Sequence, residues 1–182
     1  MPDPPRSLDP VQLGAYFALI EVAGLLRHAV EQQLRDAGDL SYVQFQLLAR
    51  LGDSPTGSHR MTDLADGVVY SRSGLTYQAG LLEKAGLIAR APSSENERAT
   101  LVTITDSGLA LFGRVLPGHI QVVRRFLFDP LSDDDLHHLG DIMTRVRDHM
   151  RAQPPRSAAP RKRRPGPTPP TPAATQGMDQ RS

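Results

Sequence analysis

The chain has 182 residues, of which 5% are aromatic, and it contains neither tryptophan nor cysteine. This length suits one globular domain, and the scarcity of aromatic residues predicts packed helices around a core of Leu, Val, Ile and Ala. The absence of cysteine excludes disulfides, cysteine-ligated zinc, a cysteine nucleophile and thiol redox sensing.

The formal net charge of +1 conceals two regions of opposite sign. From Arg151 onward there are seven basic residues and one acidic residue, a net charge of +6, whereas the preceding chain has 14 basic and 19 acidic residues, a net charge of −5. Because an acidic globular part disfavours nonspecific coating of nucleic acid, any DNA binding must come from a local surface. Eight of the 16 prolines lie in residues 151–182, which are predicted to form a disordered tail.

The N-terminal segment, residues 1–7, is predicted to be flexible, and it lacks the apolar stretch of a signal peptide. The longest apolar stretch, near Leu13 to Leu26, is interrupted by Glu21 and is expected to be too short and too interrupted to span a membrane. A cytoplasmic protein is therefore expected.

The first helix is predicted over residues 8–37. Its apolar residues recur at steps of three and four, with one wider gap: Leu13, Phe17, Ile20, Leu26, Val30 and Leu34. Gly38 is expected to end this helix. Ser41 and Gln44 form a capping-box pattern, which predicts that a second helix begins at Ser41.

The segment from Met61 to Asp106 predicts a short helix over 63–67, a tight turn, a second helix and a two-stranded β-ribbon. Ser71 is placed to cap the second helix, and its inward face is predicted to consist of Leu75, Ala79 and Leu82. The ribbon follows from the apolar residues after Gly86 and from alternation over 101–105, with a polar tip between them. This order is typical of a winged helix-turn-helix, which places one helix in a DNA major groove.

Two more helices are predicted at the C-terminal end. The first covers about 106–128, with a kink or break at Pro117 and Gly118, and the second begins at Ser132 with three aspartates in its first turn. Its apolar stripe contains Leu136, Leu139, Met143, Val146 and Met150. A small winged domain offers too little surface to cover such stripes at both termini. We therefore expect the terminal helices to pack on each other and on a second copy of the chain.

Three runs occur in a familiar order: LADGVVYSRSGLT, LLEKAGLIAR and ERATLVTITDSG. Together they resemble the multiple antibiotic resistance regulator (MarR) family of bacterial transcription factors, over residues 8–150. The resemblance implies a mainly α fold with a small β-wing (α+β), in which dimerisation helices at 8–37 and 106–150 flank a DNA-binding part at 41–105. It also implies a homodimeric, ligand-responsive repressor that reads a pseudo-palindromic operator in double-stranded DNA.

The residues expected to contact DNA lie on the second helix of the motif and on the wing: Ser71, Arg72, Ser73, Thr76, Tyr77, Arg90 and Arg98. Ser71 leaves free N–H groups at a helix N-terminus, where phosphate binds. Arg72 is suited to a guanine, and Thr76 is suited to a thymine methyl group. By resemblance, Arg98 is the wing arginine that enters the minor groove.

The wing departs from the family pattern, which commonly reads Asp-Pro-x-Asp-Arg-Arg. Glu97 stands in place of the first wing arginine, and Asn96 replaces the acid that usually braces the second. Residues 60–104 carry five basic and five acidic side chains, so the winged part is neutral. The RKRR run at 161–164 is a candidate source of compensating phosphate attraction, for which a solvated disordered tail is the simpler interpretation. A winged helix that contacts protein instead of DNA is the alternative.

The resemblance further implies a small aromatic or anionic effector that binds between the dimerising helices and the winged part and lowers DNA affinity. The candidate pocket residues are Phe17, His28, Phe45, Tyr70 and Phe112, for which ordinary core packing is the simpler interpretation. The six histidines show neither HxxxH nor HExxH spacing, so no metal is expected, and a metal-responsive regulator is a further alternative. No catalytic motif is present, so neither enzymatic activity nor a cofactor is expected.

Overall fold

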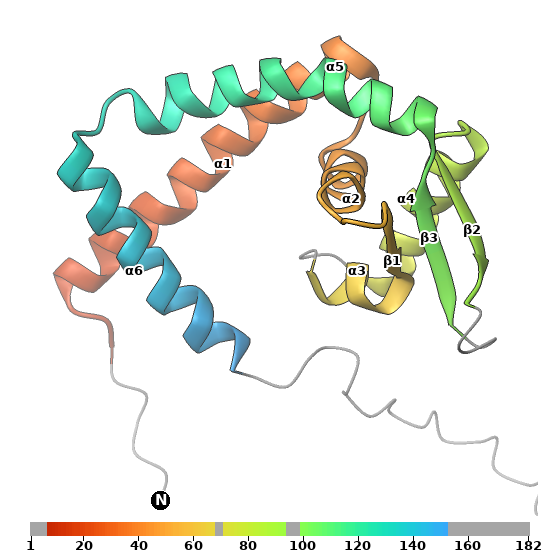
Figure 1. Ribbon diagram of the computed structural model, residues 1–182. Coiled ribbons are helices and arrows are strands. Elements are labelled where there is room, and N and C mark those ends of the chain that lie inside the picture. Colours follow the sequence, from red (N-terminus) through yellow and green to blue (C-terminus); the bar gives the residue numbers. More distant parts are fainter. Residues whose placement is uncertain (1–6, 68–70, 94–98, 153–182) are drawn as a thin grey trace, which may run out of the picture.

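The computed structural model describes residues 7–67, 71–93 and 99–152, which form a mainly helical chain with a small antiparallel sheet (Figure 1). The elements in chain order are α1 (Pro10–Gly38), α2 (Tyr42–Gly52), β1 (Ser58–Arg60), α3 (Met61–Gly67), α4 (Arg72–Lys84), β2 (Ile88–Pro92), β3 (Thr100–Ile104), α5 (Asp106–Val123), the π-helical segment η1 (Arg124–Phe128) and α6 (Asp133–Arg151). The mainly α fold with a small β-wing is confirmed.

Helix α1 begins after a capping box formed by Asp9 and Gln12 and continues for 29 residues. The helix ends at Gly38, as predicted, but the residue in the left-handed conformation is the next one, Asp39, with φ 51°. Gly38 is needed for space instead. A Cβ atom there would lie 2.8 Å from Val115 Cγ2 and 3.2 Å from Leu111 Cδ1, so α1 passes very close to α5 at this point.

The core lies where α2, α4 and the sheet meet the C-terminal part of α1 and the first half of α5. Helix α2 begins at the predicted capping box of Ser41 and Gln44 and buries Val43, Phe45, Leu47, Leu48 and Leu51. Helix α1 contributes Val30 and Leu34, and α5 contributes Leu111 and Val115. The core is therefore rich in leucine and valine, as the composition indicates.

The sheet has three strands in the order β1-β3-β2, and both pairings are antiparallel. Ile88 pairs with Ile104 and Pro92 with Thr100, which gives the predicted ribbon. Strand β1 was not predicted, because its three residues are too few to show alternation. Strand β1 is fixed by its partners, since Ser58 pairs with Thr103 and the two hydroxyl oxygens lie 2.7 Å apart.

The first turn of α5 packs against the turn that ends α4, although β2 and β3 lie between the two helices in the sequence. The Gly86 and Leu87 N–H groups donate to the carbonyls of Glu83 and Leu82, and Gly86 has φ +71°, which together form a Schellman motif. Thr105 then donates from Oγ1 to the Gly86 carbonyl over 2.7 Å and from its N–H to the Leu87 carbonyl over 3.1 Å. A Cβ on Gly108 would overlap the Leu87 carbonyl oxygen, so the first turn of α5 rests on this turn.

A kink or a break was predicted at Pro117 and Gly118. Helix α5 continues through both residues, so a break there is wrong. A proline removes the hydrogen bond to the carbonyl four residues earlier, which belongs to Gly113. Gly113 is exposed to water, which limits the cost of that loss. The irregular segment comes later, as the π-helical turn of η1.

The two terminal helices leave a large apolar surface uncovered within one chain. Helix α6 begins at the predicted Ser132 cap but buries none of its residues, and the first two thirds of α1 are exposed as well. Helix α1 packs against α5, and Figure 1 shows that the first turns of α1 and the start of α6 lie at the side of the molecule opposite the winged part. The large exposed apolar residues of the two helices are Val11, Leu13, Tyr16, Phe17, Leu19, Ile20, Val22, Leu25, Ile142, Met143, Val146 and Met150, and Leu8 just before α1 is exposed as well.

Candidate nucleic-acid interface

One face of α4 packs against the core, and the opposite face is exposed to solvent. Leu75, Ala79 and Leu82 are buried against the rest of the winged part, as predicted. The residues expected to contact DNA lie on the opposite face: Arg72, Ser73, Thr76 and Tyr77 are all exposed, and Tyr77 is 65% accessible to solvent. The first two turns of α4 therefore present an open polar surface.

Ser71 caps α4, and its Oγ accepts a hydrogen bond from the Gly74 N–H over 3.2 Å. At a helix N-terminus the first amide groups have no partner within the helix, so those of Arg72 and Ser73 point outward. Such groups, together with the positive end of the helix dipole, bind phosphate. The arrangement allows the N-terminus of α4 to rest on a DNA backbone.

Arg72 and Arg90 differ in what their guanidinium groups contact. Within the described residues, that of Arg72 has no ion pair, so its five N–H donors are available. Arg90 instead donates from Nε to Glu83 Oε2 over 2.9 Å, and this hydrogen bond lowers the pKa of the Glu83 carboxyl group. Gly80 leaves room for the arginine, since a Cβ there would lie 3.9 Å from Arg90 Nη2. The pair connects β2 to the end of α4, so the expected DNA contact of Arg90 competes with an internal one.

A hollow of about 180 Å³ opens beside α4, between α3 and the start of β3. Its lining is mixed: Met61, Ala65 and Ala99 are apolar, whereas Thr62, Thr100 and, from α4, Arg72 and Thr76 are polar. The expected DNA residue Arg98, with Asn96 and Glu97, lies outside the described residues, as does the RKRR run at 161–164.

Residues 38–99 match the sequence profile of the MarR family. The chain is similar to Sco3205, a MarR family transcriptional regulator from Streptomyces coelicolor whose structure was solved in complex with DNA, with 33% identity and a TM-score of 0.77 over 84% of this chain and 94% of that chain. The chain belongs to the MarR family. It is a DNA-binding transcriptional regulator, and MarR-family proteins are transcription regulators rather than enzymes.

Two further relatives support this membership. AbsC, a MarR family transcriptional regulator from Streptomyces coelicolor, is 31% identical with a TM-score of 0.76 over 81% of this chain and 99% of that chain. The transcriptional regulator PecS from Dickeya dadantii is 30% identical over 89 residues, which are 49% of this chain and 53% of PecS. The match to PecS thus spans about half of that protein.

The residues predicted to bind an effector in this MarR-family chain do not come together as one site. Phe45 is 5% exposed, and its ring centroid lies 5.6 Å from that of Phe112 and 4.4 Å from that of His119. Phe17 and His28 are exposed on α1, and Tyr70 lies outside the described residues. Phe45 and Phe112 therefore take part in core packing, which was the simpler interpretation.

His119 is a neighbour of this aromatic pair that the sequence analysis did not single out. Burial lowers the pKa of its imidazole, and within the described residues its Nδ1 atom is buried without a hydrogen-bond partner. Helical spacing indicated the inward face of α5. It carried no signal that His119 contacts Phe45 of α2, because these two residues are far apart in the sequence.

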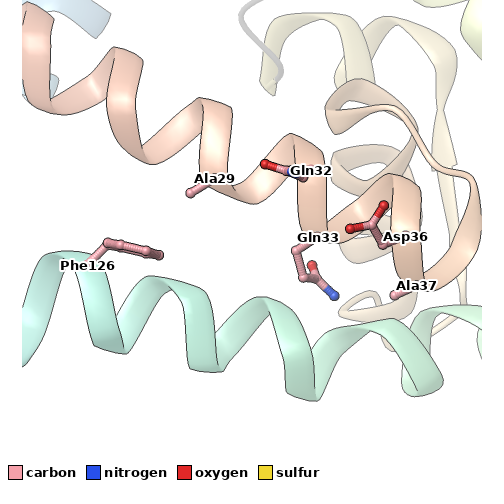
Figure 2. A pocket seen from close by; sticks show the side chains of 6 residues that line it. All are labelled: Ala29, Gln32, Gln33, Asp36, Ala37 and Phe126. Atoms are coloured by element: carbon pink, nitrogen blue, oxygen red, sulfur yellow. The ribbon is translucent and has the colours of Figure 1, made fainter.

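A shallow depression of about 520 Å³, open to solvent, lies between α1 and η1 (Figure 2). Its lining consists of Ala29, Gln32, Gln33, Asp36, Ala37 and Phe126, and Figure 2 shows Phe126 facing α1 across the open space. Gln33 donates from Nε2 to the Val115 carbonyl over 3.3 Å, and its Oε1 is buried without a partner in the described residues. No residue predicted to bind an effector lines this depression.

Metal coordination finds no support in the part of the chain that the structure describes, where no three His, Asp or Glu residues form a group that could hold an ion.

Proposed function

We propose that this MarR-family regulator is a cytoplasmic homodimer that reads a pseudo-palindromic operator with α4, while the wing lies beside it. The proposal rests on the presence of two different surfaces on the same chain. One is the open polar face of α4 at Arg72, Ser73, Thr76 and Tyr77, and the other is the uncovered apolar face of α1 and α6. Residues 41–105 then bind DNA, and residues 8–37 and 106–150 form the dimer.

The uncovered face is too apolar for a lone chain in water. Val11 and Leu25 of α1 are 82% and 66% exposed, and Met150 of α6 is 68% exposed. Soluble monomers rarely expose contiguous apolar patches larger than a few hundred Å². A second copy of the same face is a partner of matching chemistry, and a two-fold axis would pair the two faces.

The apolar stretch near Leu13 to Leu26 was expected to be too short and too interrupted to span a membrane. Helix α1, which contains it, has 29 residues and is long and apolar enough, by length and composition alone, to cross one. One such helix is weak support for a membrane span. Its C-terminal part carries Val30 and Leu34 into the core of the winged part, which supports a protein partner for the rest of the helix.

A two-fold dimer places its two recognition helices in successive major grooves, so its half-sites are expected about one helical turn apart. Selection from random double-stranded DNA tests this. The expected product is an enriched pseudo-palindrome with that spacing. If no palindrome is enriched, sequence-specific DNA binding by α4 is contradicted. The chain is then better explained as a winged helix that contacts protein.

The dimer has its own test in light scattering at micromolar concentration. We expect twice the chain mass of 19.9 kDa. A stable monomer would contradict the assignment of α1 and α6 to dimerisation. Replacing Val146 by aspartate gives a matched probe, because a buried charge in the proposed contact should shift the protein toward the monomer.

Repression and response to a small aromatic or anionic effector complete the proposal. An effector that binds a conformer with the wrong spacing of recognition helices must lower operator affinity by linkage. Titration of the operator complex with phenols and aromatic acids measures this effect. If none of these compounds shifts affinity, the effector class is wrong, while the DNA-binding function stands.

A further inference from the structure

A groove of about 520 Å³ lies where the end of α1, the start of α2 and one side of α4 meet. Its volume is within the range of about 300–1,000 Å³ that is typical of small-molecule sites. None of the described residues that were predicted to bind an effector lines it. Tyr77 of α4 lines the groove and is also part of the exposed face proposed to contact DNA, so a molecule bound here would touch that face.

Several polar groups of the lining are already paired within the protein. Glu31 Oε1 lies 2.8 Å from Arg27 Nε, and the guanidinium carbon of Arg27 lies 5.5 Å from the centroid of the Tyr42 ring. Ser41 and Gln44 form the capping box of α2. The charge of Glu31 is therefore neutralised by Arg27, and the groove keeps two other charged groups.

These two groups are Arg35 and Asp39, and neither forms an ion pair within the described residues. Opposite charges four residues apart on a helix are normally neighbours. Asp39, however, has left the helix with φ 51°, and it is the only residue other than glycine with a positive φ in the described part of the chain. The groove thus presents one free positive group and one free negative group, with a net charge of zero.

A molecule that satisfies both groups needs a carboxylate for the guanidinium of Arg35 and a cationic donor for the carboxylate of Asp39. Tyr42, Tyr77 and Leu81 supply aromatic and apolar lining beside these charges. Such a lining favours an aromatic body through burial and ring packing. We propose that this groove binds a free aromatic α-amino acid in its zwitterionic form.

Binding in the groove has a consequence for DNA. Tyr77 is 65% accessible to solvent, and an amino acid packed on its ring would occupy a side chain that the operator needs. Operator and amino acid then compete for Tyr77, and each lowers the affinity for the other by the same factor. This consequence rests on the proposed function, whereas occupation of the groove does not.

The experiment uses the full chain and three probes that share a phenyl ring. L-Phenylalanine carries both charges, phenethylamine lacks the carboxylate, and hydrocinnamate lacks the ammonium group. Isothermal titration calorimetry measures binding to the protein without DNA. We expect L-phenylalanine to bind about tenfold more tightly than either of the other probes, because each of them lacks one charge-assisted contact.

Two variants identify the charged groups. Asp39→Asn keeps the left-handed backbone, which asparagine readily adopts, and should weaken L-phenylalanine about tenfold without changing hydrocinnamate. Arg35→Gln should weaken L-phenylalanine by a similar factor without changing phenethylamine. Asp36→Asn is the matched control, because Asp36 is an exposed carboxylate of the same helix that does not line the groove, and it should change no affinity. Circular dichroism checks that α1 is intact in each variant.

The operator recovered from the random selection tests the competition. At saturation, L-phenylalanine should raise the operator Kd about fivefold or more, and Asp39→Asn should remove this effect at the same concentration. An unchanged operator Kd in the presence of bound L-phenylalanine would overturn the competition at Tyr77.

Three calorimetric results would overturn the site itself. These are no binding of L-phenylalanine at millimolar concentration, equal binding of the three probes, and equal losses in Asp39→Asn and Asp36→Asn. All three leave operator binding intact. A selection that returns no operator overturns the proposed function, while the calorimetric test of the groove stands.

Discussion

Replacing Gly38 by alanine tests the close contact between α1 and α5. The added Cβ would lie 2.8 Å from Val115 Cγ2 and 3.2 Å from Leu111 Cδ1. Val115 is fully buried, so its side chain has no free space into which to move. The helices must therefore separate by several tenths of an ångström at the junction between the dimerisation helices and the winged part.

The expected change is the difference between two opposing effects. Alanine is better than glycine within a helix by at most about 1 kcal/mol, and less near the last residue of α1. Overpacking a filled core costs about 1–3 kcal/mol. We therefore expect Gly38→Ala to lower the free energy of unfolding by about 1–2 kcal/mol. Urea denaturation at one fixed protein concentration measures it, because the stability of a dimer depends on concentration.

Gly113→Ala is the matched control on α5. A Cβ at Gly113 would meet nothing within 4 Å, so only the helix preference acts and a gain of about 0.5–1 kcal/mol is expected. Opposite signs for the two variants would support the close contact. If Gly38→Ala stabilises the protein as much as Gly113→Ala does, the reasoning from the 2.8 Å contact is refuted.

The other predictions concern DNA binding and pH. Arg72→Ala should cost about 1–3 kcal/mol at one symmetric base position in competition assays with operator variants, and an equal loss on scrambled DNA would show a phosphate contact instead. If Arg90 serves only to connect β2 to α4 through Glu83, then Arg90→Gln and Glu83→Gln should both leave the slope of log Kd against log salt unchanged. If Arg90 contacts a phosphate, Arg90→Gln should reduce this slope by about 0.9. Burial lowers the pKa of His119 below 6.5, so its neutral form stabilises the fold fully above pH 6.5, and this contribution falls as the pH drops toward the pKa of the folded state. His119→Leu should remove that part of the pH dependence of the urea midpoint, and an unchanged profile would assign it to other groups. Deleting residues 151–182 should weaken binding to operator and scrambled DNA alike and reduce the salt slope by about 0.9 for each lost contact, and a loss confined to the operator would show that the tail reads sequence.

Local signals in the sequence were sufficient for most of the helix boundaries. Ser41, Ser71 and Ser132 each cap the helix that they were predicted to cap, because a capping pattern involves residues only three positions apart. The inward face of α4 followed from spacing in the same way. The DNA contacts assigned to that helix stay predictions until an operator is available.

The features that the sequence did not predict depend on contacts between distant segments. Strand β1 exists because β3 pairs with it, and three residues are too few to signal a strand alone. The role of Gly38 depends on Val115, which is 77 positions away and occupies the space that a Cβ would need. Arg90 was expected at DNA, and only the fold shows that Glu83 lies within reach of its guanidinium group.

The attachment of α5 to the turn after α4 has a mechanical consequence. Thr105 and Gly108 fix the start of α5 against Gly86 and Leu87, so we expect the recognition helix and α5 to move together. A helix of 18 residues is about 27 Å long, so a tilt of about 5° displaces its far end by about 2 Å. Any force applied at the η1 end of α5, whether from a second subunit or from a bound molecule, therefore reaches the DNA-reading surface as a change of angle. The distance between the two recognition helices of a dimer can thus be adjusted without any rearrangement inside the winged part.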